Sequence, residues 1–418
     1  MNKVKLSEVA NVELSSIDKK IVQGEKSVKL CNFTDVYYNW AITKSIVDKC
    51  MKGSVNESEF SKFALKKGQV AITKDSETRS DIGMSTYISE DFDDVVLAYH
   101  CALITPKEGK VNGKYLNALL NDSYGRKYFA NQASGSGQRY TLSKEAIESI
   151  KIPLPSMEKQ NAIGSFFSNI DRKIELNNRI NDNLSHYLDL IYDFWFSQFD
   201  FPNKANIPYK SNYGAMCFSQ KLRKMIPQGW EVVPLKRIAT ISSESVIPQP
   251  QTEYSHYSIP SFDELRLPNI ELGSLIGSTK YKVSSNMILV SKLNPQFKRV
   301  WLINNAEEDS ICSTEFIPFQ TKDIPIEYLF GILNSYAFNK YMVQCSSSST
   351  GSRKRMTPEL CLQFSVALPP TEIINEYSTK VKGAIKLISD NLNENSKLNA
   401  LRKTLLPLLM NGQATITD

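Results

Sequence analysis

Two Gly/Ser-rich loops that end in basic residues are the segments of this sequence best suited to bind an anion. The first, SGSGQRY, covers residues 134–140, and the second, SSSSTGSRKR, covers residues 346–355; neither contains Asp or Glu. Gly and Ser allow close backbone approach and donate N–H and O–H groups to phosphate oxygens, and Arg can also bond a guanine in two places. One such loop alone would be interpreted as a solvent-exposed connection. Two at the same place in a repeat favour contact with DNA.

We expect DNA contacts from these loops and from one lysine after a β-type run in each half of the chain. The candidate residues are Ser136, Gly137, Gln138, Arg139, Tyr140, Lys74, Ser352, Arg353, Lys354, Arg355 and Lys292. The sequence does not indicate which of them read bases and which contact phosphates.

The two loops occupy the same position in an internal repeat. Tyr115 aligns with Tyr328 at an offset of 213, and after one inserted residue Arg139 aligns with Arg353 at an offset of 214. The alignment continues into a Pro-rich stop, IPLPS in the first copy and VALPP in the second. Chance similarity would not hold one offset, with one slip, through a helix, a loop and a stop. An internal repeat therefore organises the fold.

A long amphipathic segment follows each copy. Apolar residues recur every three or four positions from Ile163 to Trp195 and again 214 residues later, which is typical of a long helix with a packing seam. Two asparagines stand at the same central places of both seams, where a buried Asn fixes register and orientation. Antiparallel pairing would set these asparagines opposite one another. Arg402 alone departs from the apolar pattern.

The seam and a neighbouring face of the first helix are the expected interfaces. The seam residues are Ile170, Ile174, Asn177, Asn181, Leu184, Ile388, Asn391, Asn395, Leu398 and Leu405. The first helix carries a further apolar row that includes Leu190 and Phe194, and a helix that is apolar on two faces is buried on two faces. We expect this row to bind partner subunits. Packing against the protein's own globular units is the alternative.

These features divide the chain into four segments. A globular unit at 1–152 precedes a long helix at 153–199, and a connector with a second globular unit at 200–367 precedes a second long helix at 368–418. Short β-type runs such as QVAITK and MILVSKL alternate with turns in both units. The expected fold class is α+β, with two mostly β units and two long helices that pair as an antiparallel coiled coil with pseudo-two-fold symmetry.

Composition narrows the class of protein. A chain of 418 residues exceeds one ordinary core, and its net charge of +6 permits an anionic partner without demanding one. Seven scattered cysteines without a C-x-x-C pair, and only three histidines, argue against a disulfide framework or a zinc site. No apolar run reaches membrane length and the N-terminus is not a signal peptide. We expect a cytoplasmic protein with reduced thiols and no membrane partner.

Over essentially its whole length the chain resembles the specificity (S) subunit of Type I restriction-modification systems. The segments that carry the resemblance are SGSGQRYTLSKEAIESIKIPLPSMEKQNAI, STGSRKRMTPELCLQFSVALPPTEI, IPQGWEVVPLKRIA and LRKTLLPLLMNGQ. It implies two target recognition domains that each read one half of a split DNA sequence, and helices that set the spacing between the halves. It implies as partners double-stranded DNA with a bipartite recognition sequence, two modification (methyltransferase) subunits, and restriction subunits where the system is complete. The second loop departs from the first, which leaves its individual contact residues open.

No catalytic residue and no metal site is assigned in this chain. The NPQF segment at 294–297 is similar to the N-P-P-[YF] loop of amino-methyltransferases, but Gln296 replaces the second proline and no Gly-rich turn for S-adenosylmethionine precedes it. The P-loop pattern of ATP-binding proteins is absent. We expect S-adenosylmethionine, ATP and Mg only in partner subunits. A coiled-coil scaffold that binds only proteins is the alternative, and it would have no affinity for duplex DNA.

Overall fold

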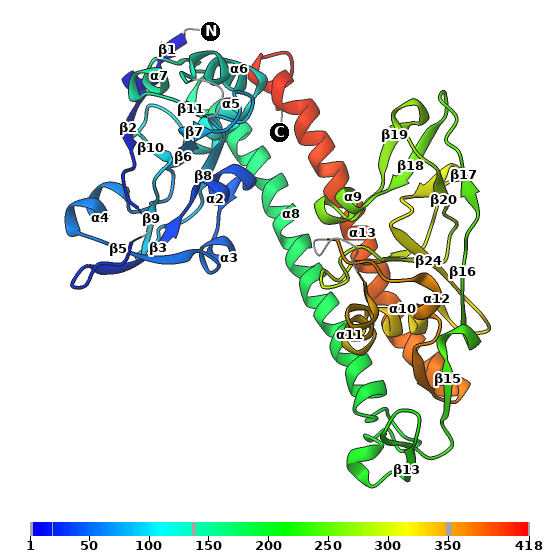
Figure 1. The fold of residues 1–418 in the computed structure, drawn as a ribbon. Helices are drawn as coiled ribbons and strands as arrows, with labels where there is room; N and C mark the ends of the chain where they lie inside the picture. Colours follow the sequence, from blue (N-terminus) through cyan, green and yellow to red (C-terminus); the bar gives the residue numbers. More distant parts are fainter. Residues whose placement is uncertain (1–2, 19, 136–138, 348–352, 417–418) are drawn as a thin grey trace. The chain divides into compact units, whose positions relative to one another are not determined.

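The computed structural model describes residues 3–18, 20–135, 139–347 and 353–416 (Figure 1). The chain forms two compact units: unit 1 contains residues 1–176 and 397–418, and unit 2 contains residues 177–396. The two long helices, α8 (Met157–Tyr192) and α13 (Thr371–Met410), each contribute residues to both units. They lie within the segments 153–199 and 368–418 where the sequence predicts them.

A five-stranded sheet forms the centre of unit 1. Its strands, in spatial order, are β2 (Ala10–Leu14), β10 (Cys101–Pro106), β6 (Val70–Thr73), β8 (Ser85–Ile88) and β4 (Ala41–Ile42). Every residue of β6 and β8 is buried, because Val, Ile and Tyr suit a strand that is covered on both faces. A second sheet has the order β5 (Met51–Val55), β3 (Lys26–Cys31), β9 (Val95–Leu97).

Unit 2 repeats the main sheet of unit 1. Its strands, in spatial order, are β16 (Ala239–Ile241), β24 (Phe316–Thr321), β21 (Met287–Ser291) and β22 (Val300–Ile303). All neighbours are antiparallel, as are the first four strands of the sheet in unit 1. A second sheet has the order β17 (Ser245–Val246), β20 (Lys280–Lys282), β23 (Ser310–Cys312), β18 (Glu253–Tyr257), β19 (Asn269–Leu272). The α+β class with two mostly β units is confirmed.

A short strand closes each unit directly before its long helix. In unit 1, β1 (Lys3–Lys5) pairs with β12 (Lys151–Pro153), and in unit 2, β15 (Glu231–Pro234) pairs with β25 (Ser365–Leu368). Two helices come before the candidate loop in both copies. They are α5 (Gly113–Asn121) and α6 (Ser123–Gln132) in unit 1, and α10 (Ile326–Asn334) and α11 (Tyr336–Cys345) in unit 2.

Short helices complete both units. They are α1 (Leu6–Val9), α2 (Phe33–Tyr38), α3 (Lys44–Val47), α4 (Glu57–Phe63), α7 (Lys144–Glu148), α9 (Ile259–Glu264) and α12 (Pro358–Cys361). No helix in the described part of the chain is long and apolar enough to span a membrane.

The long helices pair antiparallel through their asparagines, as predicted. In unit 2 the Nδ2 atom of Asn177 donates to Oδ1 of Asn395 at 2.9 Å, and Nδ2 of Asn391 donates to Oδ1 of Asn181 at 2.8 Å. In the repeat, Asn177 corresponds to Asn391 and Asn181 corresponds to Asn395, so the two bonds are equivalent. A local pseudo-two-fold axis therefore passes between them. All four asparagines are buried. The seam residues beside them are buried or half-buried: Ile170, Ile174, Leu184, Ile388, Leu398 and Leu405.

Arg402, the exception in the seam, has its own partners within unit 1. Its guanidinium lies 5.0 Å from the centroid of the Trp40 ring and 3.8 Å from a carboxylate oxygen of Asp171. Burial lowers the pKa of Arg402 and raises the pKa of Asp171 to about 6, although the nearby arginine opposes the second shift. The cationic Arg402 can therefore occupy a seam position, because the Trp40 ring face and the Asp171 carboxylate stabilise its charge there.

Candidate nucleic-acid interface

The backbone of unit 1 closes the first candidate loop at its root. Ser134 and Thr141 exchange two hydrogen bonds, of 3.0 Å and 2.8 Å, from amide to carbonyl. Strand β11 (Tyr140–Thr141) pairs with β7 (Asp75–Ser76), and the amide of Leu142 donates to the carbonyl of Lys74 at 2.8 Å. The loop is thus fixed to the chain that leaves the central strand β6.

Unit 2 closes the second loop with the same bonds. Ser347 and Arg355 exchange amide-to-carbonyl bonds of 3.0 Å and 2.8 Å, and the amide of Met356 donates to the carbonyl of Lys292 at 3.0 Å. In the repeat these residues correspond to Ser134, Thr141, Leu142 and Lys74. The alignment of Lys74 with Lys292, made from sequence alone, therefore identifies a shared anchor for both loops.

A charged cluster lies at the root of the loop of unit 1. The Oδ2 atom of Asp75 lies 2.8 Å from Nδ1 of His100, 3.1 Å from Nζ of Lys74 and 3.5 Å from a guanidinium nitrogen of Arg139. Arg139 also lies 2.7 Å from Nδ1 of His100, which can accept from Arg139 or, when protonated, donate to Asp75. Burial opposes ionisation of Asp75, but hydrogen bonds from His100, Thr141 and Lys74 outweigh it and lower its pKa to about 2. Asp75 is therefore an anion that holds Arg139 at the loop.

In unit 2 a carboxylate takes the place of this histidine. The amide of Lys74 donates to the carbonyl of His100, and the amide of Lys292 donates to that of Glu315, so His100 and Glu315 occupy equivalent positions. Glu315 binds the guanidinium of Arg355 through both oxygens, at 2.9–3.2 Å. These bonds raise the pKa of Arg355. The two loop roots share a backbone but differ in charge.

Lys74 and Arg355 make contacts within the loop roots that the sequence did not predict. Lys74 is 8% exposed, because its ammonium lies between Asp75 and the ring face of Tyr99, 4.5 Å from the ring centroid. The prediction that Lys74 is presented to DNA is therefore wrong, and the residue positions Asp75 instead. Arg355 is engaged by Glu315, which makes it an anchor of the loop. Lys292 is half-buried and contributes its backbone to the loop root.

The remaining loop residues differ in how far they can be placed. Arg139 keeps 55% of its side chain exposed, and Arg353 and Lys354 are exposed. Tyr140 is half-buried, with the guanidinium of Arg79 5.1 Å from its ring centroid. The other predicted contacts lie outside the described residues: Ser136, Gly137, Gln138 and Ser352.

Sequence reasoning missed the aromatic side chains and the acid beside the first loop. The Tyr99 and His100 ring centroids lie 4.1 Å apart, and the Phe33 ring meets His100 edge-on. Tyr99 and Phe33 are 43% and 40% exposed. His100 has a φ of 75°, a strained conformation for a residue with a side chain. The one sequence signal for Asp75 was its place directly after Lys74, the lysine that aligns with Lys292.

The NPQF segment holds the second loop. Asn294 accepts from the amide of Lys354 through Oδ1 at 3.0 Å, and its own amide donates to the carbonyl of Lys354 at 2.8 Å. Asn339 in turn donates to the carbonyl of Pro295 at 2.9 Å. The asparagine thus makes contacts that position the loop.

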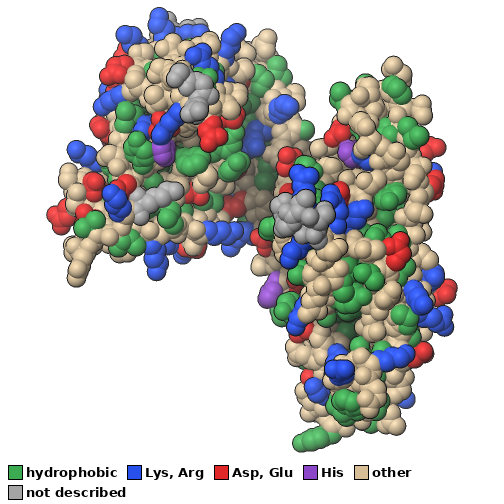
Figure 2. Space-filling model, viewed as in Figure 1, with side chains coloured by type: hydrophobic (Ala, Val, Ile, Leu, Met, Phe, Trp, Pro, Cys, Tyr) green, Lys and Arg blue, Asp and Glu red, His purple; other side chains and the backbone are tan. Residues whose placement is uncertain are grey.

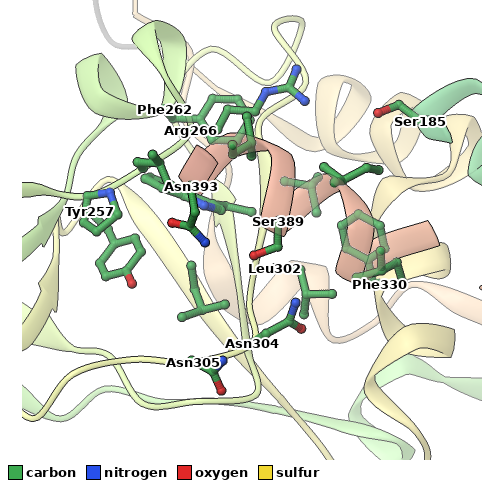
Figure 3. A pocket seen from close by; sticks show the side chains of 18 of the residues that line it. Ser185, Tyr257, Phe262, Arg266, Leu302, Asn304, Asn305, Phe330, Ser389 and Asn393 are labelled. Atoms are coloured by element: carbon green, nitrogen blue, oxygen red, sulfur yellow. The ribbon is translucent and has the colours of Figure 1, made fainter. Parts of the chain in front are cut away.

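Unit 2 also has a cleft of about 610 Å³ that involves neither loop (Figure 3). Ser389 and Asn393 of α13 face Leu302 and Asn304 at the end of β22 across it. Lys298 on its wall is paired with Asp189 at 3.6 Å.

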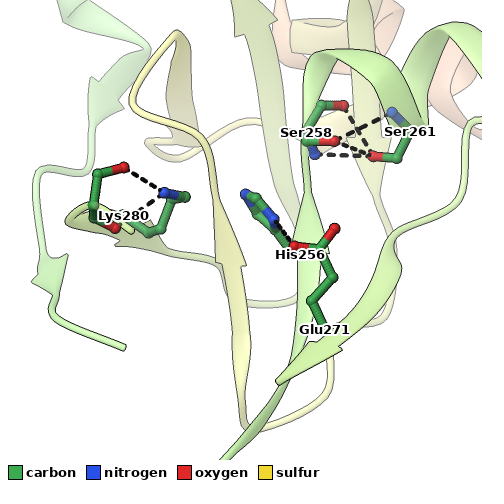
Figure 4. Close-up of polar contacts among 6 residues, drawn as sticks. His256, Ser258, Ser261, Glu271 and Lys280 are labelled. Atoms are coloured by element: carbon green, nitrogen blue, oxygen red, sulfur yellow. Dashed lines mark hydrogen bonds and ion pairs between the residues drawn. The ribbon is translucent and has the colours of Figure 1, made fainter. Parts of the chain in front are cut away.

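A histidine in the second sheet of unit 2 is held by one carboxylate (Figure 4). Nδ1 of His256 lies 3.0 Å from Oε2 of Glu271, and its Nε2 atom is buried without a partner among the described residues. The nearby ammonium of Lys280 donates to Ser278 instead. With 9% of its surface exposed, His256 serves the packing of the sheet.

Comparison with known proteins agrees with this geometry. Residues 1–186 match the family model described as Type I restriction modification DNA specificity domain. The chain is 22% identical over 417 residues to the Type I restriction enzyme HindI specificity subunit of Haemophilus influenzae, covering 84% of this chain and 88% of that protein. It is 23% identical over 330 residues to the MjaIX specificity subunit of Methanocaldococcus jannaschii, covering 75% of this chain and 72% of that protein.

The fold is similar to that of a solved structure. The crystal structure of the Type-I restriction-modification system S subunit from M. genitalium superposes with a TM-score of 0.59 at 13% identity, covering 98% of this chain and 95% of that chain. The chain therefore combines a duplicated α+β unit, with a basic loop in each copy, and a match to the specificity-domain model over the first copy. Residues 1–186 are thus similar to the DNA specificity domain of Type I restriction-modification systems, and most of the chain is similar to specificity subunits of such systems.

Proposed function

We propose that this chain reads a bipartite DNA sequence, one half with each loop-bearing unit, and so directs a Type I restriction-modification complex to its sites. The observation that carries the proposal is the duplicated loop root. Two segments more than 200 residues apart in sequence are closed by the same backbone bonds, and each presents basic side chains. Two similar readers suit a site with two specific blocks.

The catalytic steps in this proposal belong to partner subunits. Modification subunits would bring S-adenosylmethionine, and restriction subunits, where present, would bring ATP and Mg. The role of Asn294 in holding Lys354 supports a non-catalytic chain, because the motif most similar to a methyltransferase loop instead holds the backbone of the second candidate loop. We place the complex in the cytoplasm, where DNA and these partners meet.

An exposed apolar row on α8 and on the π-helical turn Asp193–Ser197 that continues it supports docking of the modification subunits. Tyr187, Leu190 and Phe194 are 39%, 55% and 38% exposed and line a groove with Trp195 and Lys380, all within unit 2. Packing against the protein's own units is the alternative for this row, and the exposure of these side chains supports docking of a partner instead. The repeat equivalent of Tyr187 is Leu401, which is 42% exposed in unit 1. One such site per helix suits two modification subunits.

Reconstitution tests this function. We expect the purified chain alone to leave DNA unmethylated, and the chain with its modification subunit to methylate one bipartite sequence. Arg139→Ala and Arg353→Ala should each weaken recognition. If the arginine contacts a phosphate, its removal should reduce the salt dependence of DNA affinity by about one charge. If it contacts a base, its removal should cost about 1–3 kcal/mol of binding free energy and relax specificity at one position.

Three results would count against the proposal. Methylation by the chain alone would refute its non-catalytic role. Normal affinity and specificity of both arginine variants would refute the loop assignment. Absence of any DNA affinity in the assembled complex would favour a protein-only scaffold.

A further inference from the structure

The connector between α8 and the second globular region is basic throughout. Residues 201–228 contain five Lys or Arg residues and no Asp or Glu. The five are exposed: Lys204, Lys210, Lys221, Arg223 and Lys224. None of them makes an ion pair with an acid in the described part of the chain. In Figure 2, Lys and Arg side chains gather with hydrophobic ones over the end of unit 2 where Figure 1 labels β13.

A β-hairpin in this connector exposes apolar side chains between the cations. Strand β13 (Met216–Ser219) pairs with β14 (Lys224–Pro227), which sets Phe218 opposite Met225. These two are 57% and 46% exposed, whereas Ile226 is 3% exposed and joins the core of unit 2. Ile226 thus anchors the hairpin, and the Phe218–Met225 pair faces outward. Tyr213, in the turn before the hairpin, is 99% exposed.

The mixture of exposed cations and exposed apolar side chains helps to decide between two anionic partners, DNA and an acidic protein surface. A DNA backbone would use the cations but offers phosphates and sugars to Phe218 and Met225, which gain little from them. A protein surface with an apolar pocket and an acidic rim would use both. Exposed apolar groups ringed by charge are the usual form of a protein docking site, and opposite charge at its rim steers association.

We propose that the β13–β14 hairpin is a docking site for an acidic, apolar-centred face of the modification subunit. This partner rests on the function proposed above. The choice follows from continuity with the groove on α8. The ammonium of Lys224 lies 4.7 Å from the centroid of the Phe199 ring. Asp193, which precedes the groove residue Phe194, is close enough to Lys224 to influence the pKa of that ammonium. A subunit seated on Phe194 therefore meets the root of the hairpin.

The test measures binding of the full-length chain to its purified modification subunit at low and high salt. Phe218→Ser/Met225→Ser and Lys221→Glu/Arg223→Glu are the hairpin variants, and all four positions are exposed, so the fold should tolerate them. Ile270→Ser and Lys49→Glu/Lys52→Glu are matched controls at exposed positions outside the hairpin segment. Thermal unfolding checks that each variant is folded.

We expect each hairpin variant to bind the subunit roughly tenfold more weakly, with the controls unchanged, as for loss of one central anchor group. The deficit of the charge variant should shrink at high salt, because salt screens rim charges. Unchanged affinity of both hairpin variants, with binding lost in Leu190→Asp/Phe194→Asp, would overturn the hairpin site and leave the proposed function intact. Unchanged assembly with a reduced salt slope for DNA would assign the hairpin to DNA. Failure of the unaltered chain to bind the subunit would refute the proposed function itself.

Discussion

Arg139 and Arg355, at the two loop roots, carry the same charge but make different contacts. Arg139 shares Asp75 with His100 and Lys74 and keeps half of its surface free, whereas Arg355 is bound through two bonds to Glu315. A bidentate arginine–carboxylate pair fixes geometry as well as charge. Arg355 therefore shapes the loop from which Arg353 and Lys354 extend.

The pairing of Arg355 with Glu315 can be tested by a double-mutant cycle on DNA binding. If Arg355 acts through Glu315, Arg355→Ala should weaken binding in the normal chain but have little further effect in a Glu315→Ala background. The measurement is the affinity of the assembled complex over a range of salt concentrations. An undiminished loss in the Glu315→Ala background, with a salt slope lower by about one, would mean that Arg355 touches a phosphate.

Asp171 gives the chain a pH-dependent stability. Burial raises the pKa of its carboxyl from 3.8 to about 6, so the protonated form stabilises the folded state. This contribution is complete below pH 3.8 and is lost as the pH rises through about 6. Relative to Asp171→Asn, the normal chain should lose about 2–3 kcal/mol of unfolding free energy between pH 4 and pH 7. Urea unfolding of both chains at each pH measures this, and an equal difference at both values would contradict it.

At the scale of elements, the features that could be predicted from the sequence are those determined by local periodicity. The helices, their antiparallel pairing and the facing asparagines follow from the spacing of Asn177 and Asn181 and its repetition at Asn391 and Asn395. The second sheets could not be predicted in this way. Their strands join residues far apart in sequence, such as the parallel pair β3 and β9, and local patterns do not encode such partners.

The site shows the same division. The position of the two loops, their offset and the alignment of Lys74 with Lys292 were predicted, because these features recur in both copies; the role of both lysines as loop anchors was not. Asp75, His100 and Glu315 were not, because the two copies carry different residues there. The burial of Lys74 depends on Tyr99, which reaches it through tertiary structure.

The asparagine network is asymmetric, which gives an element-scale prediction. Nδ2 of Asn395 donates to Oδ1 of Asn178 at 2.8 Å, but the repeat equivalent of Asn178 is Leu392, and Nδ2 of Asn181 is left without a partner among the described residues. Asn178→Leu should leave Nδ2 of Asn395 without this acceptor as well, and should cost about 1–3 kcal/mol of unfolding free energy. Asn178→Asp keeps an acceptor oxygen and should cost much less. Denaturant unfolding compares the two, and equal losses would show that this bond contributes nothing.

At the scale of the whole molecule, the two long helices are continuous in sequence from one unit to the other, so their length should set the spacing of the two DNA blocks. Extension belongs inside the helices, because α8 ends in the aromatic core of unit 2, where Phe196 packs on Trp230. Seven residues inserted after Leu176 and seven after Ser396 leave the asparagine network within unit 2. The insertions preserve the seam and lengthen each helix by about 10.5 Å.

The chain with both insertions should recognise the same two blocks with a free stretch longer by about three base pairs, since B-DNA rises 3.4 Å per base pair. Activity should fall, because three base pairs also rotate one block by roughly a quarter turn relative to the other. Methylation-site sequencing in cells that carry the variant and its partner subunits measures both effects. Exchanging residues 1–150 for the corresponding unit of a similar specificity subunit is the companion experiment, and it should change one block only. A recognised sequence that stays the same length after insertion, or an exchange that alters both blocks, would show that the helices do not separate two independent readers.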